Sequence, residues 1–283
     1  MEILVCIKPV PDPEQYDSLR IDPETKRLVR EGIPTVINPA DKNALEEALR
    51  IREACGGRIT VLTMAPAEAG REKLLESLAM GADRGYLLSD AVFGGADTYA
   101  TSYVLAEAVR KIEAAETTEP GVKNGTFHLI LTGNESADGA TAHVPAQLAA
   151  WLGLPHLCGV NEIRVDENSL KETGLLRVWK KTEEGRAVFE GAPPAVLAVT
   201  RDINKPRLIN AMGIIKAKRK PLTVWSNGDL GLEMSRIGLA GSTTQPGELL
   251  TPDLSRKAEA LGEDPAEAAE RILAIMEKAG VSA

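Results

Sequence analysis

The sequence predicts an α/β fold, with a doubly wound, mostly parallel sheet, helices on both faces, an antiparallel extension and a C-terminal arm. Three observations predict it. Short apolar runs alternate four times with amphipathic helical patterns, as in parallel sheets covered by helices. Residues 161–191 alternate polar and apolar residues between turn signals, which is typical of antiparallel strands. Residues 264–280 carry the pattern of a terminal amphipathic helix.

Prolines, polar residues and a helix-capping residue mark the boundaries of the first predicted elements. Residues 2–10 form a short apolar run ended by prolines, which predicts a strand. Residues 11–37 are polar and predict a hairpin or an irregular excursion. Asn38 and Pro39 then resemble a helix cap and a first-turn proline. The helix that follows places four side chains on one face, namely Leu45, Ala48, Leu49 and Arg52.

The alternation of predicted strands and helices continues to about residue 152. The predicted elements are a strand over 58–66, a helix over 67–80 ended by Gly81, a strand over 84–90, a helix capped by Asp97 or Thr98, a surface linker over 116–125, and a strand over 127–133 that leads into a further helix. A buried strand is predicted over 194–200. Residues 199–246 then show little regular pattern, and an extended arm that packs on another subunit would explain them.

Composition limits the function classes. A net charge of −8 and only 4% aromatic residues argue against a nucleic-acid binder. No apolar run approaches the roughly 20 residues of a membrane-spanning helix, and the N-terminus does not resemble a signal peptide. The three cysteines are far apart and predict reduced, buried thiols of a cytoplasmic protein. No His/Cys pair has metal-ligand spacing, so no metal site is predicted.

One loop suggests a ligand. The stretch LTGNESADGATAHV (131–144) places many small and polar residues between a buried strand and a helix, where a short turn would suffice. Small residues allow close approach to a ligand, and a helix N-terminus attracts phosphate. Three other strand ends share this composition, at 6–9, 64–66 and 89–98. Ligands of open parallel sheets bind beyond the carboxyl ends of strands, so an adenine-nucleotide-type ligand is predicted.

The remaining motifs and residues do not indicate catalytic chemistry of their own. There is no Walker loop, no dinucleotide fingerprint and no catalytic constellation, so the pattern favours a carrier whose cofactor supplies the chemistry. His143 could touch a phosphate or serve as a cap, while His128 is predicted to be structural. Glu46 and Glu47 are predicted to lie on a solvated face. A stand-alone ATP-binding enzyme or nucleotide sensor is the alternative from a different class.

The segment VTRDINKPRLINAMGIIKAKRKP (199–221) holds seven basic residues in an otherwise acidic chain. It predicts a docking surface, or alternatively a basic loop that keeps an arm soluble. This segment resembles the signature of the electron transfer flavoprotein β subunits. The stretches CIKPVPD, NPAD, LTMAP and AMGADRG, in this order, resemble the same family over nearly the whole chain.

The resemblance implies a nucleotide-binding α/β domain over 1–225 and an arm with a helix over 226–283 that packs on the α subunit, the obligate partner. It also implies a nucleotide in contact with residues from four strand ends. These are Cys6, Asn38, Pro39, Ala40, Asp41, Met64, Gly133, Asn134, Glu135, Ser136, Asp138, Gly139, Ala140, Thr141, Ala142, His143 and Val144.

The loop FGGADTYATS (93–102) is similar to that of the electron-bifurcating members. This implies FAD in the β subunit, held also by Phe93, Gly94, Gly95, Asp97, Thr98 and Thr101, which accepts hydride from NADH; AMP is the alternative nucleotide. Ala140 stands where that group has an acidic residue, and Pro145 removes an N–H donor near the phosphates. Docking to an acyl-CoA dehydrogenase or another redox partner is assigned to Arg207, Ala211, Met212 and Lys216.

Overall fold

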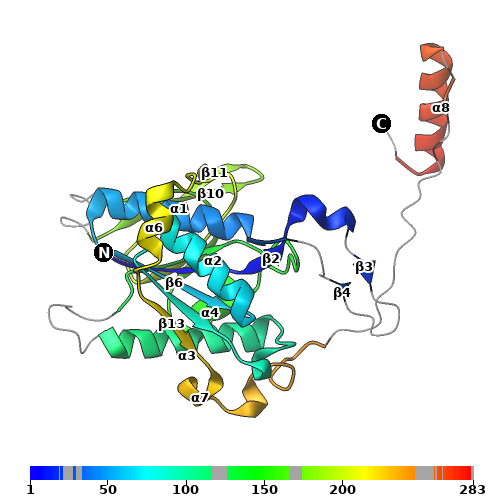
Figure 1. Ribbon diagram of the computed structural model, residues 1–283. Coiled ribbons are helices and arrows are strands. Elements are labelled where there is room, and N and C mark those ends of the chain that lie inside the picture. The colour runs from blue at the N-terminus through cyan, green and yellow to red at the C-terminus, as the bar shows by residue number, and fades with distance from the viewer. Residues whose placement is uncertain are drawn as a thin grey trace. The chain divides into compact units, whose positions relative to one another are not determined.

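The computed structural model describes residues 1–18, 20–21, 28–29, 34–116, 126–165, 174–245, 258, 260–262 and 264–281 (Figure 1). The chain divides into two compact units, Met1–Pro246 and Gly247–Ala283, and each is described by itself. The predicted surface linker lies almost wholly outside the described residues, as does much of the segment that joins the two units.

The first unit is built on a nine-stranded sheet. Its strands follow the order β11 (Gly185–Gly191), β10 (Leu176–Thr182), β9 (His156–Arg164), β12 (Ala195–Val199), β8 (Leu129–Gly133), β1 (Glu2–Cys6), β6 (Arg58–Met64), β7 (Arg84–Leu88) and β13 (Leu222–Trp225). Neighbours from β9 to β13 are parallel, whereas β10 and β11 form an antiparallel hairpin at one edge. The predicted fold class is therefore confirmed.

Helices cover both faces of the sheet (Figure 1). One face carries α1 (Pro39–Cys55), α2 (Ala67–Met80) and the short α6 (Ala211–Ala217). The other carries α3 (Thr98–Glu116), α4 (Val144–Leu152) and α7 (Asn227–Leu230). The central strand shows the physical cause, because Ile3 and Val5 enter the core under the first face while Leu4 and Cys6 enter the core under the second. A strand buried on both faces reads as a continuous apolar run.

A small excursion separates β1 from α1. Strands β2 (Pro9–Pro11) and β5 (Thr35–Ile37) pair antiparallel, and a short helical turn, η1 (Pro13–Ser18), follows β2. Strands β3 (Arg20–Ile21) and β4 (Leu28–Val29) pair in the same way. This agrees with the predicted hairpin, although part of the segment lies outside the described residues.

The late segment corrects the sequence analysis. Residues 199–246 were expected to lack regular structure, yet they contribute α6, β13, α7 and the turn η3 (Met234–Arg236). Strand β13 pairs with β7 and completes the sheet. The four residues of β13 are too few to show the alternation of a strand, so only their pairing with β7 identifies them as one. Residues 226–245 belong to the first unit; their predicted packing against a partner stays a prediction.

The second unit contains α8 (Pro265–Lys278), which confirms the predicted terminal helix. The Asp264 carboxylate caps it by accepting a hydrogen bond from the Ala266 N–H at 3.0 Å. Large apolar side chains are exposed on this helix, among them Ile272, Leu273 and Ile275. Among the helices of the described chain, none combines the length and the apolar character that a bilayer crossing requires.

Candidate functional site

A cavity of about 360 Å³ opens at the carboxyl ends of the central strands. Cys6 ends β1, Met64 ends β6 and Gly133 ends β8, and all three line the cavity. The chain proceeds from β1 to β6 and β7 on one side of β1, and returns to β8 on the other side. The cavity therefore lies at the topological switch point, where ligands of doubly wound folds bind.

Asp41 joins the two strand ends that flank the switch point. Its carboxylate accepts hydrogen bonds from the Lys8 N–H at 2.8 Å and the Gly133 N–H at 2.9 Å. Burial raises the pKa of Asp41 to about 7, against hydrogen bonds from Asn38, Lys8 and Gly133 that lower it. Burial also raises the pKa of the neighbouring Cys6 thiol to about 12, with a contribution from the Asp41 charge, so this thiol stays protonated at neutral pH.

Gly133 allows the close approach of β8 and α1. A Cβ at this position would lie 2.4 Å from an Asp41 carboxylate oxygen and 2.8 Å from the Ala40 Cβ. Both distances are far below van der Waals contact, so only glycine fits between β8 and the first turn of α1. The floor of the cavity is thus fixed by one glycine and one buried carboxylate.

Three helices begin at the cavity. The lining includes Asn38 and Asp41 at the start of α1, Asp97 and Thr98 at the start of α3, and Val144 at the start of α4. Helix N-termini present unpaired N–H groups and the positive end of the helix dipole. Their convergence makes this end of the sheet suited to an anionic ligand.

Asn38 holds the loop before α4 in place. Its side-chain amide donates to the Glu135 carbonyl at 2.9 Å and its side-chain oxygen accepts from the Ala137 N–H at 3.0 Å. Further along this loop, Ala140 and Ala142 adopt positive φ angles of 47° and 55°. Such angles are strained for residues with a Cβ and are concentrated at functional sites. The loop is therefore held in a specific conformation.

Lys8 is a lining residue that the sequence analysis did not single out. Its ammonium lies 2.7 Å from an Asp138 carboxylate oxygen and 3.3 Å from the Ser136 hydroxyl. Its place directly after the first strand was the available signal, because residues 6–9 had already been identified as a strand end facing the ligand.

The opposite wall comes from the loop between β7 and α3. Phe93 is buried in the short turn η2 (Ala91–Phe93), and Gly95 has a positive φ of 74° against the Leu239 side chain. Asp97 caps α3 by accepting from the Ala100 N–H at 2.9 Å. It also accepts four hydrogen bonds, at 2.8 to 3.0 Å, from the backbone and hydroxyl groups of Thr243 and Thr244.

These hydrogen bonds determine the charge of Asp97. Burial alone would raise the pKa of this carboxyl, but the donors from Ala100, Thr243 and Thr244 outweigh burial and lower the pKa to about 2. Asp97 is therefore ionised at any physiological pH. The segment before the second unit is attached to the same loop that lines the cavity.

Most of the residues predicted for the site do lie together. The structure places at the cavity Cys6, Asn38, Asp41, Met64, Phe93, Gly95, Asp97, Thr98, Thr101, Gly133, Glu135, Ser136, Gly139, Thr141, Ala142, His143 and Val144. The lining lacks Pro39, Ala40, Gly94, Asn134, Asp138 and Ala140. It adds Ile7, Lys8, Ala96, Leu105, Thr132 and Pro145. Which of these residues contact a ligand stays a prediction.

Some predicted residues outside the lining support it instead. Ala40 packs against Gly133, and the Asn134 side-chain oxygen accepts from the Gly159 N–H at 2.8 Å. Asp138 reaches the cavity through its pair with Lys8. His143 is the N-cap residue of α4, and its exposed side chain makes no cap hydrogen bond; its contact with a phosphate stays a prediction.

The four predicted docking residues fall into two groups. Ala211, Met212 and Lys216 are exposed on α6. Arg207 instead binds α1, with its guanidinium 2.8 Å from Glu46 and 2.6 Å from Glu53. The expectation of a solvated Glu46 and Glu47 was wrong, since both are buried: Glu46 pairs with Arg207, and Glu47 accepts from the Asn204 amide at 2.9 Å. Charge patterns in the sequence do not reveal partners 157 to 161 residues away.

Two minor expectations have mixed outcomes. The His128 Nδ1 accepts a hydrogen bond from the Glu2 N–H at 3.1 Å, which agrees with a structural role. The cysteines are free thiols, but only Cys6 is buried, while Cys55 and Cys158 are partly exposed.

The structure is a doubly wound α/β fold with a cavity at the switch point of its sheet, which is where ligands of such folds bind. The model of the electron transfer flavoprotein domain matches residues 25–230. The chain belongs to the electron transfer flavoprotein family, on the β-subunit side, as its motifs had indicated.

Three relatives illustrate the similarity. The electron transfer flavoprotein subunit beta of Thermoanaerobacterium thermosaccharolyticum is 39% identical over 260 residues, covering 92% of this chain and 91% of the relative. The caffeyl-CoA reductase-Etf complex subunit CarD of Acetobacterium woodii is 40% identical, covering 87% and 86%. The protein FixA of Bradyrhizobium diazoefficiens is 38% identical, covering 95% and 89%.

Proposed function

We propose that this chain is the β subunit of a heterodimeric electron transfer flavoprotein and that its cavity binds FAD. The observation that carries this proposal is the convergence of three helix N-termini on one cavity at the switch point. Phosphates fit this end, since α1, α3 and α4 offer N–H groups there. Met64, Phe93 and Leu105 supply apolar surface for a flat ring on the other side.

The residues of the chain hold and orient the cofactor. When bound, FAD would supply hydride transfer from NADH and the passage of electrons to the flavin of the α subunit and a redox partner, as in flavin-based electron bifurcation. The Cys6 thiol is protonated and Asp97 is saturated with hydrogen bonds, so neither is suited to act as a nucleophile or base. Gly133 and Asp41 hold the chain after β1 and the end of β8 together at the floor of the cavity.

The alternative nucleotide is AMP, held as a structural ligand by the same loop before α4. The two proposals differ at the wall formed by Phe93, Gly95 and Asp97, which an isoalloxazine or nicotinamide ring would cover and AMP would leave open. The similarity of residues 93–102 to the bifurcating members supports FAD.

The test is a nucleotide inventory of the purified αβ complex, in which the protein is denatured and the released ligands are identified by mass and absorbance. Two FAD per heterodimer are expected. One FAD with one AMP would overturn the FAD proposal for this cavity. A Gly133→Ala variant should lose one nucleotide per heterodimer. A Gly191→Ala variant, whose new Cβ meets nothing within 4 Å, should keep both.

We also propose that the exposed face of α6 docks the redox partner, an acyl-CoA dehydrogenase or a related CoA-ester reductase. Met212 is 60% exposed there, and the preceding Leu208 is 94% exposed. The name of the relative CarD, which includes a caffeyl-CoA reductase, supports a partner of this class. A Met212→Ser variant should slow electron transfer to the partner and keep its full flavin content. A cytoplasmic location also stays a prediction.

A further inference from the structure

The charged groups around the cavity are unevenly balanced. Lys8 is the single lysine among the described lining residues, and none of them is an arginine. Three carboxylates, those of Asp41, Asp97 and Glu135, belong to the same lining. A ligand with phosphates therefore meets more acidic than basic side chains, and its binding depends strongly on where the Lys8 charge is directed.

Two of the three carboxylates are already occupied. Asp41 is buried and accepts two backbone N–H groups, and Asp97 accepts five hydrogen bonds from its own helix and from Thr243 and Thr244. In contrast to these two carboxylates, the Lys8 side chain is 48% exposed, although the Lys8 N–H is fixed by its hydrogen bond to Asp41. Its ammonium lies at hydrogen-bond distance from Asp138 and Ser136, so these two acceptors determine where its charge is directed.

The partner of Lys8 belongs to the loop that leads into α4. Asp138 lies six residues before Val144, the first residue of α4, and its side chain is 14% exposed. A carboxylate in this place is a competing acceptor for the Lys8 ammonium when a phosphate lies at the start of α4. The Lys8 side chain is 48% exposed, and ion pairs with a solvent-exposed member contribute little to stability, so this pair can open at little cost.

We propose that Lys8 is the phosphate-binding cation of the cavity and that Asp138 competes with the nucleotide phosphate for it. This inference rests on the proposed function, since it assumes a nucleotide in the cavity. Before binding, the pair holds Lys8 at the rim and keeps weakly charged molecules from using it. Binding transfers the ammonium from Asp138 to the phosphate, which is a stronger charge-assisted acceptor.

The opposite role for Asp138 gives the opposite prediction. Carboxylates near the sheet edge can bind the ribose hydroxyls of a nucleotide, as in dinucleotide-binding folds. In that case removal of the Asp138 charge would weaken binding. In the proposed competition, removal of the charge strengthens binding, because Lys8 is released. The sign of the change distinguishes the two roles.

The experiment measures dissociation constants for AMP and for adenosine on the full αβ complex after its nucleotide has been removed. AMP is chosen because FAD contains an AMP half, and adenosine lacks the phosphate. Asp138→Asn is expected to lower the AMP dissociation constant about three- to ten-fold. Lys8→Gln is expected to raise it about ten-fold or more. Neither should change adenosine binding more than about two-fold, and Lys8→Arg should largely restore AMP affinity.

A double variant tests the coupling between the two residues. In the Lys8→Gln background, Asp138→Asn should have no further effect on AMP. A matched control is the Lys42–Glu76 pair, which joins α1 to α2 at 2.9 Å outside the cavity lining. Lys42→Gln and Glu76→Gln should leave both ligands unaffected. Thermal unfolding of every variant establishes that it is folded.

Each outcome decides between the proposals. If AMP binds and Asp138→Asn weakens it, or if Lys8→Gln affects AMP and adenosine equally, the inference is overturned while the nucleotide site remains. If the unmodified complex binds neither AMP nor FAD, the proposed function fails and the inference fails with it. A selective gain of AMP affinity in Asp138→Asn, absent in the double variant, supports the competition.

Discussion

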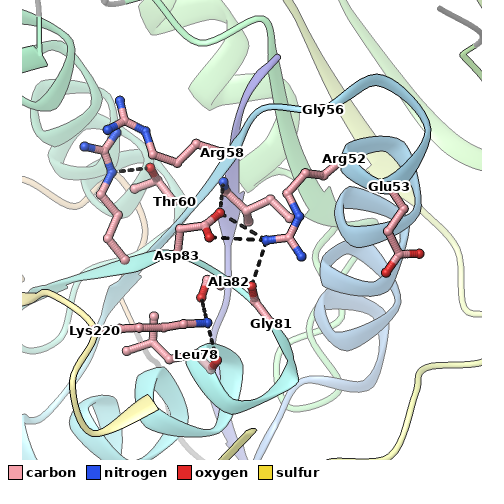
Figure 2. Close-up of polar contacts among 12 residues, drawn as sticks. Arg52, Glu53, Gly56, Arg58, Thr60, Leu78, Gly81, Ala82, Asp83 and Lys220 are labelled. Carbon is pink, nitrogen blue, oxygen red and sulfur yellow. Dashed lines mark hydrogen bonds and ion pairs between the residues drawn. The ribbon is translucent and has the colours of Figure 1, made fainter. Parts of the chain in front are cut away.

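The two ends of the parallel sheet use charge in opposite ways. At the carboxyl end, the helices α1, α3 and α4 begin, and their N–H groups face a cavity. At the amino end, α1 and α2 finish, and basic side chains cover carbonyl groups at the end of α2 (Figure 2). There Arg52 donates to the Gly81 carbonyl at 2.8 Å, and Lys220 donates to the Leu78 carbonyl at 3.0 Å.

At the amino end of the sheet, the polar groups of the protein form hydrogen bonds with one another. Asp83 accepts from Arg52 at 3.1 Å and from the Ile59 N–H at 2.8 Å. Figure 2 shows Arg52 between Asp83 and the Gly81 carbonyl, and Lys220 separately on the Leu78 and Ala82 carbonyls. Burial lowers the pKa of Lys220, although the charge of Asp83 opposes this. Cations near helix C-termini are favourable because of the helix dipole. At the amino end, polar groups pair within the protein, whereas at the carboxyl end helix N-termini face a cavity, where we propose that the nucleotide binds.

The largest effect is expected at the carboxyl end, from Gly133→Ala. The new methyl group would lie 2.4 Å from an Asp41 oxygen, so the start of α1 must shift. Overpacking of this kind costs about 1–3 kcal/mol of unfolding free energy. Nucleotide binding should be lost as well, and both can be measured by chemical denaturation and ligand release. Full nucleotide content in this variant would show that the glycine does not define the cavity floor.

The next effect tests the amino end alone. Asp83→Ala removes the acceptor of Arg52 and of the Ile59 N–H, which should lower the unfolding free energy by about 1–3 kcal/mol. Nucleotide affinity measured on the folded complex should not change. As a control, Asp229→Ala removes the exposed N3 carboxylate of the α7 capping box and should lower the unfolding free energy by less than Asp83→Ala does. Loss of nucleotide from folded Asp83→Ala would break the comparison between the two ends.

A third prediction concerns pH and Asp41. Because burial raises the pKa of Asp41 from 3.8 to about 7, the folded protein holds a proton there that the unfolded chain releases between these values. The unfolding free energy therefore falls as pH rises from about 4 to about 7 and levels off above that range.

The variant Asp41→Asn should be less stable at low pH, because its amide NH₂ cannot accept from the N–H of both Lys8 and Gly133. Its deficit relative to the unmodified protein should shrink as pH rises to about 7. Denaturant titrations at pH 5, 6, 7 and 8 measure this difference. A deficit that is constant with pH would contradict a titrating Asp41.

The smallest effect is local. Asp97→Asn places an NH₂ group against the four donors of Thr243 and Thr244, so these residues should detach while the rest of the domain stays folded. Hydrogen exchange of the Thr243 and Thr244 amides should become faster, and global stability should change by less than about 1 kcal/mol. Asp229→Asn, in α7, serves as the matched control. Unchanged exchange in Asp97→Asn would mean that the segment is held by other contacts.

The sequence by itself determined the alternation of strands and helices, since that pattern is local. The helix over 67–80 agrees with α2 (Ala67–Met80), because a helix period and a terminal glycine are read within one turn. Small residues at four strand ends also pointed to the edge of the sheet where the cavity lies, because all parallel strands end on the same side of a sheet. The family motifs indicated most of the residues that line this cavity.

Only the tertiary structure decided which polar groups meet. Lys8 faces Asp138 across 130 residues, Arg207 reaches Glu46 across 161, and Thr243 binds Asp97 across 146. No local period carries such pairings, because they depend on strand order and on the path of the chain over the sheet. The four residues of β13 likewise became a strand only against β7. The preference for helix or strand depends on neighbouring residues, whereas burial and charge pairing depend on the assembled fold.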